Sequence, residues 1–221
     1  MPSRRIAILV LAAVTFGAAQ VGLRADEIID RVLAVVSGEV ITLSDARAAR
    51  TFGLVDLPPG VDALNAVLQK LIDRDLMLGE VEHYSPPEPD PAAIDRRLEA
   101  IRRRFPTQAA YEQALLTAGF DQSHLRAVVR DNLRIQAYLD QRFPAPPAPA
   151  DEEIEQYYRT HPALFTRDGV LQPLAHVRTA VVSRMTAEQR NALVAEWLAG
   201  LRLRGNVTIL YLGGSTPPSP R

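Results

Sequence analysis

Apolar residues along the chain recur mainly at intervals of three and four positions, which is the spacing of amphipathic helices. The clearest stretch, 61–82, places leucine and isoleucine on one wide face and predicts a helix in the core of the fold. Similar stripes predict helices over 91–105, 107–118 and 121–142, and one more behind position 186. The residues that set these stripes are Leu64, Leu68, Leu71, Ile72, Leu76, Leu78, Ile94, Leu98, Ile101, Phe105, Tyr111, Leu115, Leu116, Leu125, Val128, Val129, Leu133, Ile135, Leu139, Leu193, Val194, Trp197, Leu198 and Leu201. The pattern predicts a mainly α protein.

Three segments depart from the helical spacing. Residues 30–44 predict a β-hairpin, because two runs rich in β-branched residues flank Ser37 and Gly38, which are typical turn residues. Residues 207–212 predict a final strand. Residues 174–183 are typical of a strand or an irregular segment. A small amount of β-structure is therefore expected beside the helices.

Capping residues predict where the helices begin and end. Ser44 or Asp45 can cap a short helix that runs through Arg50. Thr186 to Gln189 is a capping box, which predicts that the last helix begins there, and Gly205 predicts its end. The other predicted N-caps are Asp90, which precedes a proline at the first helical position, Thr107 and Asp121.

The first residues are typical of an export signal. Arg4 and Arg5 precede an apolar run over 6–16, and small residues follow at 17–19. We expect cleavage after Ala19. The alternative is an uncleaved anchor, because residues 6–23 fall only slightly short of the roughly 20 apolar positions that a membrane span needs. Either outcome predicts a location in the periplasm or cell envelope.

Composition excludes several functions. The chain has 221 residues, a formal net charge of -1 and no cysteine. The lack of a basic excess argues against nucleic-acid binding, and the lack of cysteine excludes disulfides, thiol catalysis and cysteine-ligated zinc. Asp73 and Asp75 lie two positions apart and so point to different faces of a helix. The four histidines have no partner at metal-ligand spacing: they are His83, His124, His161 and His176. We therefore expect no catalytic residues, no metal and no cofactor.

One apolar loop is a candidate contact surface. It lies between Gly53 and Pro58, where an apolar segment either packs onto the core or is offered to a partner. The candidate client- or partner-contacting residues are Phe52, Leu54, Val55 and Leu57.

Several stretches resemble segments of one known family. Residues 30–45, DRVLAVVSGEVITLSD, and 71–81, LIDRDLMLGEV, resemble the opening and the long second helix of the N-terminal domain of SurA-type periplasmic chaperones. Residues 151–165, DEEIEQYYRTHPALF, resemble the connector that leads into its first parvulin domain. Trp197, Leu198, Leu201 and Arg202, with the strand after them, resemble its C-terminal helix and strand. The resemblance implies a helical core with a small antiparallel sheet, which the N-terminal hairpin and the C-terminal strand form together.

The sequence patterns and the resemblance together predict a division of the chain. Residues 1–19 are the signal, 26–142 the SurA N-terminal-like helical core, and 143–150 a proline-rich linker. Residues 151–212 contain C-terminal helices and a strand that pack back on the core, and 213–221 form a disordered tail.

One departure from the family bears on activity. A parvulin isomerase domain needs about 90 further residues. Only about twenty lie between Phe165 and the helix expected near Thr186. We therefore expect no prolyl isomerase activity and no enzyme.

The resemblance leaves competing functions. The first is an ATP-independent chaperone-like module that binds unfolded or extended polypeptides of envelope and outer-membrane proteins. The second is a structural or assembly subunit with one fixed envelope partner, and the third is a degenerate isomerase. The proline-rich linker also allows a domain-swapped homodimer.

Overall fold

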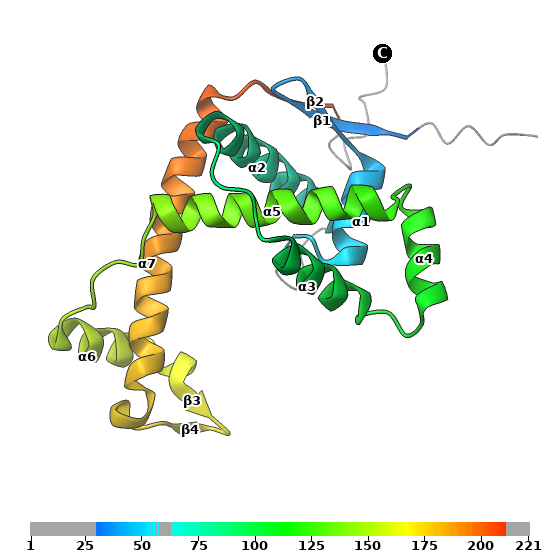
Figure 1. Ribbon diagram of the computed structural model, residues 1–221. Helices are drawn as coiled ribbons and strands as arrows, with labels where there is room; N and C mark the ends of the chain where they lie inside the picture. The colour runs from blue at the N-terminus through cyan, green and yellow to red at the C-terminus, as the bar shows by residue number, and fades with distance from the viewer. Residues whose placement is uncertain (1–29, 56, 58–62, 211–221) are drawn as a thin grey trace, which may run out of the picture.

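The computed structural model describes residues 30–55, 57 and 63–210. The fold is mainly α with a small antiparallel sheet, as the sequence predicts (Figure 1). The helices are α1 (Leu43–Phe52), α2 (Ala63–Tyr84), α3 (Pro91–Arg102), α4 (Gln108–Thr117), α5 (Gln122–Arg142), α6 (Asp151–Thr160), a 3-10 turn η1 (Pro162–Phe165) and α7 (Leu174–Arg204). The strands are β1 (Val32–Val36), β2 (Glu39–Thr42), β3 (Thr166–Arg167), β4 (Val170–Leu171) and β5 (Val207–Ile209).

The main sheet brings the two ends of the described chain together. Its strand order is β2-β1-β5, and both neighbours run antiparallel to β1. Val35 lies opposite Val40 on one side and Thr208 on the other. Ser37 and Gly38 have positive φ angles of 51° and 98°, which suits the tight turn between β1 and β2. The predicted pairing of the last strand with the opening hairpin is confirmed.

The core beneath this sheet is built around α2. Leu33 and Ala34 of β1 are fully buried against Val67 and Leu68 of α2. Leu201, near the end of α7, belongs to the same apolar cluster. Because α2 contacts the sheet, α1, α5 and α7, it buries side chains on several faces, as the wide apolar face in its sequence predicts.

A second cluster joins α1 to α3, α4 and α5. Phe52, the last residue of α1, is fully buried at its centre. Its ring centroid lies 5.8 Å from that of Phe105, 6.3 Å from Tyr111 and 6.4 Å from Phe120. These aromatic contacts hold the short helix α4 and the start of α5 against the core.

The helix α7 links the core to a projecting arm. We use this name for α6, η1, β3, β4 and the first half of α7. Its 31 residues span about 46 Å at the helical rise of 1.5 Å per residue. The first half packs with α6 and η1 through Val181, Ile154 and Phe165, and the second half returns to α2 and the sheet (Figure 1). Arg190 joins the two regions, since it donates to the carbonyl of Phe143 at 2.8 Å and to Asp140 at 2.6 Å.

Two expectations about this helix were wrong. Residues 174–183 are helical rather than a strand or irregular segment, and Thr186 lies inside α7 rather than at its start. The Thr186 hydroxyl donates to the carbonyl of Val182, four residues earlier, so it does not cap a helix. The signal that could have shown this is the spacing of Leu174, Val177, Val181 and Met185, which all pack into the arm.

The other helix boundaries agree closely with the sequence. Asp90, Thr107 and Asp121 are N-caps, and Gly205 is the C-cap of α7. The cap of α1 is Thr42 rather than Ser44 or Asp45, and Asp45 completes a capping box with it. Ser44 instead donates its backbone N–H to Asp30 at 3.1 Å. The predicted signal with its cleavage at Ala19 and the predicted tail 213–221 lie outside the described residues.

Candidate functional site

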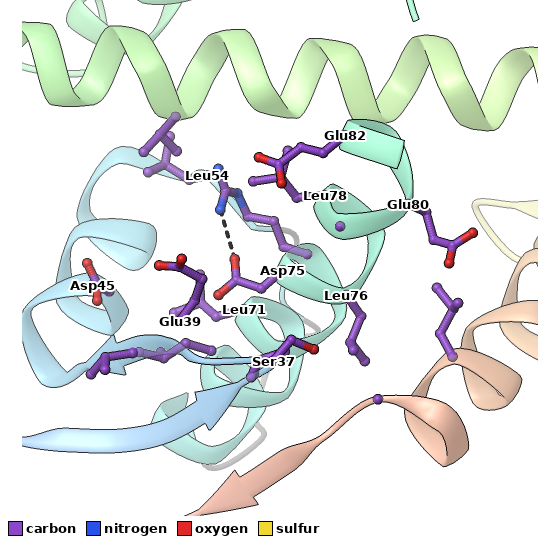
Figure 2. A pocket seen from close by; sticks show the side chains of 18 of the residues that line it. Ser37, Glu39, Asp45, Leu54, Leu71, Asp75, Leu76, Leu78, Glu80 and Glu82 are labelled. Atoms are coloured by element: carbon purple, nitrogen blue, oxygen red, sulfur yellow. Dashed lines mark hydrogen bonds and ion pairs between the residues drawn. The ribbon is translucent and has the colours of Figure 1, made fainter. Parts of the chain in front are cut away.

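A groove of about 750 Å³ lies beside α2, on the side where the β1–β2 hairpin faces the start of α5 (Figure 2). Its walls come from five parts of the chain: the hairpin, α1 with Leu54 just after it, α2, the start of α5 with Phe120 just before it, and the end of α7. The apolar residues that line it are Val36, Val40, Ile41, Leu54, Leu71, Leu76, Leu78, Phe120, Val128 and Leu201. A hollow of this size and lining is suited to apolar side chains of a ligand.

The groove depends on a close approach between α2 and the residue that ends α7. A Cβ atom on Gly205 would lie 2.5 Å from Cδ2 of Leu76 and 3.0 Å from the carbonyl oxygen of Leu201. Only glycine therefore lets the chain turn here toward β5 while Leu76 keeps its position in the lining. The end of α7 is part of the groove wall for this reason.

Charged residues form much of the remaining lining. Carboxylates come from β2, α1 and α2, and they are Glu39, Asp45, Asp75, Glu80 and Glu82. The guanidinium groups are Arg74 and Arg204. Five carboxylates and two guanidiniums give the lining a formal excess of three negative charges, whereas the whole chain carries a net charge of -1. The groove concentrates negative charge that the composition does not reveal.

Asp75 lies at the centre of this charged surface (Figure 2). Burial raises the pKa of its carboxyl above the ordinary value of 3.8, and Arg74 opposes that rise. Arg74 donates to Asp75 at 3.0 Å and to Asn132 of α5 at 2.8 Å, and its Nη2 lies 3.8 Å from Asp131. The negative charges of Asp45 and Glu39 raise the pKa of Asp75 further, so charges on α1 and β2 act on this carboxyl across the groove.

The structure separates the candidate contact residues proposed from the sequence. Phe52 is fully buried in the second cluster. The prediction that it contacts a client or partner is therefore wrong, because none of its side chain is exposed. Gly53 at φ 60° ends α1 and turns the chain, and Leu54 then lines the groove. Val55 and Leu57 are partly buried against the first cluster. Of the four, Leu54 is the one that the groove includes.

The sequence patterns did not predict that these carboxylates line a common groove. They are distributed between positions 39 and 82 without a common motif, and only the fold brings them together. Asp73 and Asp75 do point in different directions, as their spacing predicts: Asp73 pairs with Arg202 of α7, and Asp75 faces the groove. No local pattern could have shown which of the two faces the groove.

Two of the histidines stack on aromatic rings. His124 lines the groove and stacks on Phe120 with 4.1 Å between ring centroids, and His161 stacks on Tyr157 at 4.2 Å. Within residues 30–55, 57 and 63–210, no three side chains of His, Asp or Glu come together as metal ligands would. None of the helices in the described part of the chain is long and apolar enough to span a membrane.

The arm has a shallower hollow of about 550 Å³ between η1 and the first half of α7. Phe165, Val177 and Ala180 line it together with Arg167 and Arg184. It is smaller than the groove. Its residues lie in the arm, at the end of the fold that is remote from the β2-β1-β5 sheet (Figure 1).

Comparison with known proteins adds no identity. No family model matches the chain, and no curated protein matches it in sequence. Function must therefore be argued from the groove and its residues.

Proposed function

We propose that this protein is an ATP-independent, chaperone-like module of the bacterial envelope that binds unfolded or extended polypeptide segments, as the resemblance to SurA-type chaperones implies. The observation that carries the proposal is the groove beside α2, since it is open to solvent and combines apolar with charged lining. The proposed site needs neither a nucleotide nor a metal, because apolar burial alone can hold a segment weakly and reversibly.

The position of β2 supports binding of extended segments. β2 is an edge strand in the sheet that the described residues form, and its residues Glu39, Val40 and Ile41 line the groove. An edge strand has a row of backbone donors and acceptors to which another extended segment can pair. Val40 is half exposed, so an apolar side chain of a bound segment has a surface to pack on.

The proposal is tested by titrating the protein with fluorescently labelled peptides of about 15 residues, rich in aromatic and aliphatic side chains, and by following suppression of aggregation of an unfolded client. We expect micromolar dissociation constants, equivalent to about -8 kcal/mol. Val40→Ser and Leu78→Ser should each weaken binding severalfold, because each removes apolar surface from the groove. Absence of binding at tens of micromolar peptide would contradict the proposal.

Leu116→Ser is the matched control. Leu116 is a leucine with 74% of its surface exposed, and it lies on α4, outside the groove. This variant should bind peptide as the unchanged protein does. An equal loss in Leu116→Ser and Leu78→Ser would mean that peptides bind to exposed apolar surface in general and not to the groove.

A second candidate function, an assembly subunit with one fixed envelope partner, is favoured by the arm. Leu164, Val170 and Leu171 are all exposed there, at 44%, 62% and 44% of their surface. Purification from envelope extracts distinguishes the two functions. One stoichiometric partner, lost on Val170→Ser and Leu171→Ser, would favour assembly, and a spread of unfolded clients would favour the chaperone.

The proposal includes no prolyl isomerase activity. Between η1 and α7 the chain forms only the short β3–β4 hairpin, in the eight residues 166–173. This segment is far shorter than the roughly 90 residues of a small catalytic domain. A protease-coupled assay on a proline-containing peptide should proceed at the uncatalysed rate.

A further inference from the structure

The charge of the groove differs from that of the protein as a whole. Five carboxylates from three separate elements surround the apolar lining of the groove. Binding through apolar contacts alone would not require them. Clefts lined by one sign of charge attract ligands of the opposite sign and increase their local concentration. The negative charge of the lining therefore indicates a ligand that carries positive charge.

The two arginines of the groove are fewer than its five carboxylates, and Arg74 is already paired. Arg74 is held by Asp75 and Asn132 at 3.0 and 2.8 Å, and it also lies near Asp131. Its charge is thus shared with carboxylates on both sides. The side chain of Glu39, at the edge strand, is exposed and makes no hydrogen bond or ion pair to another described residue. It remains available to a ligand.

We infer that the groove selects polypeptide segments in which lysine or arginine alternates with apolar residues, with the cationic side chains placed against Glu39, Asp45 and Asp75. This inference rests on the proposed function and names its substrate class. Alternation fits because successive side chains of an extended segment point to opposite sides. One set of side chains can then meet apolar residues of the lining while the other set meets its carboxylates.

The negative charges around Asp75 also favour a cationic ligand. The negative charges of Glu39 and Asp45 raise the pKa of Asp75, so the anion of Asp75 is less stable in their presence. An ammonium or guanidinium group that enters the groove relieves this repulsion. The same three groups are not arranged as metal ligands, so the cation we infer is a side chain of the bound segment.

The test uses three peptides with the same apolar residues and with lysine, serine or glutamate at the alternating positions. Binding is measured by fluorescence anisotropy to the full-length protein at 20 mM and 500 mM salt. We expect the lysine peptide to bind about tenfold more tightly than the serine peptide at low salt, and the glutamate peptide to bind most weakly. High salt should reduce these differences, because it screens exposed charges.

Variants locate the effect. Glu39→Gln and Glu82→Gln should each reduce the preference for the lysine peptide over the serine peptide. Both residues are exposed, so these variants are expected to fold. Glu155→Gln is the matched control: it removes an exposed carboxylate from α6 on the arm and should leave the preference as it is.

The outcomes separate this inference from the proposed function. Equal affinities for the lysine and serine peptides would overturn the inference and leave the proposed function standing. Absence of binding by all three peptides would overturn both. Sedimentation as a dimer that binds none of the peptides would mean that a second copy of the chain occupies the groove, and this too would overturn the inference.

Discussion

Arg202 and Asp73 form an ion pair between α7 and α2, 129 residues apart in sequence, with Nε of the arginine 2.6 Å from Oδ1 of the aspartate. The same guanidinium donates to the side-chain oxygen of Gln69 at 2.7 Å. Three groups on two helices thus align the end of α7 along α2. The pair is partly exposed, so its own contribution to stability is small, and the main energy of this contact comes from the apolar residues beside it.

Leu201→Ala measures that apolar contribution. Leu201 is buried in the first cluster, and we expect its truncation to lower the free energy of unfolding by about 2–4 kcal/mol through lost packing. Leu203, two residues later on the same helix, has 89% of its surface exposed, and Leu203→Ala should change stability by about 0.5 kcal/mol or less. Urea unfolding followed by the fluorescence of Trp197, the one tryptophan of the chain, gives both values.

The test is the difference between these two variants in the free energy of unfolding. Similar losses for Leu201→Ala and Leu203→Ala would contradict the packing of α7 on the core, because only one of the two side chains is in contact with it.

Ala187→Pro tests whether α7 is continuous. If a helix began at Thr186, as its capping box suggests, Ala187 would be the first helical position, where proline is well tolerated. Inside a continuous helix, proline removes a hydrogen bond and collides with the preceding turn, and the cost is about 3 kcal/mol or more. We expect the large loss, together with lower helical circular dichroism.

Ala187→Gly serves as the control for this test. Residue 187 is exposed, so glycine should cost about 1 kcal/mol through helix propensity alone. A proline variant that is as stable as the unchanged protein would place a helix start at Thr186 after all.

Phe52→Ala tests the aromatic cluster. The ring contacts Phe105, Tyr111 and Phe120, so its removal should lower the free energy of unfolding by about 3–5 kcal/mol. Leu116→Ala, on exposed surface of α4, should change it by about 0.5 kcal/mol or less. A mild effect of Phe52→Ala combined with lost peptide binding would contradict the burial of this side chain.

The charge of Asp75 should make stability depend on pH. Because the folded protein raises the pKa of this carboxyl above 3.8, its ionised form is disfavoured relative to the unfolded chain. The contribution of Asp75 is therefore fully present below the ordinary pKa and is lost as pH rises through the raised value. Asp75→Asn should gain stability relative to the unchanged protein over that range and should show no further relative change above it.

Nuclear magnetic resonance titration of the Asp75 carboxyl gives the direct measurement. Its midpoint should lie above 3.8 and should move down in Glu39→Gln, since the charge of Glu39 helps to raise it. A midpoint at or below 3.8 would contradict the arrangement of charges in the groove.

The sequence by itself determined the elements whose signals are local. The apolar spacing of α2, α3 and α5 showed these helices because one face of each is buried continuously. The caps Asp90, Thr107 and Asp121 and the turn at Ser37 and Gly38 were also evident, since each satisfies backbone geometry within a few residues.

Only the tertiary structure decided the full extent of α7 and the makeup of the groove. Thr186 carries the pattern of a helix start, and only the burial of Val181 against Ile154 and Phe165 makes the helix continue through it. Glu39 and Asp75 lie on different elements, and no local pattern states that they will face one another. Local signals report contacts close in sequence, whereas these features arise from burial and charge between distant segments.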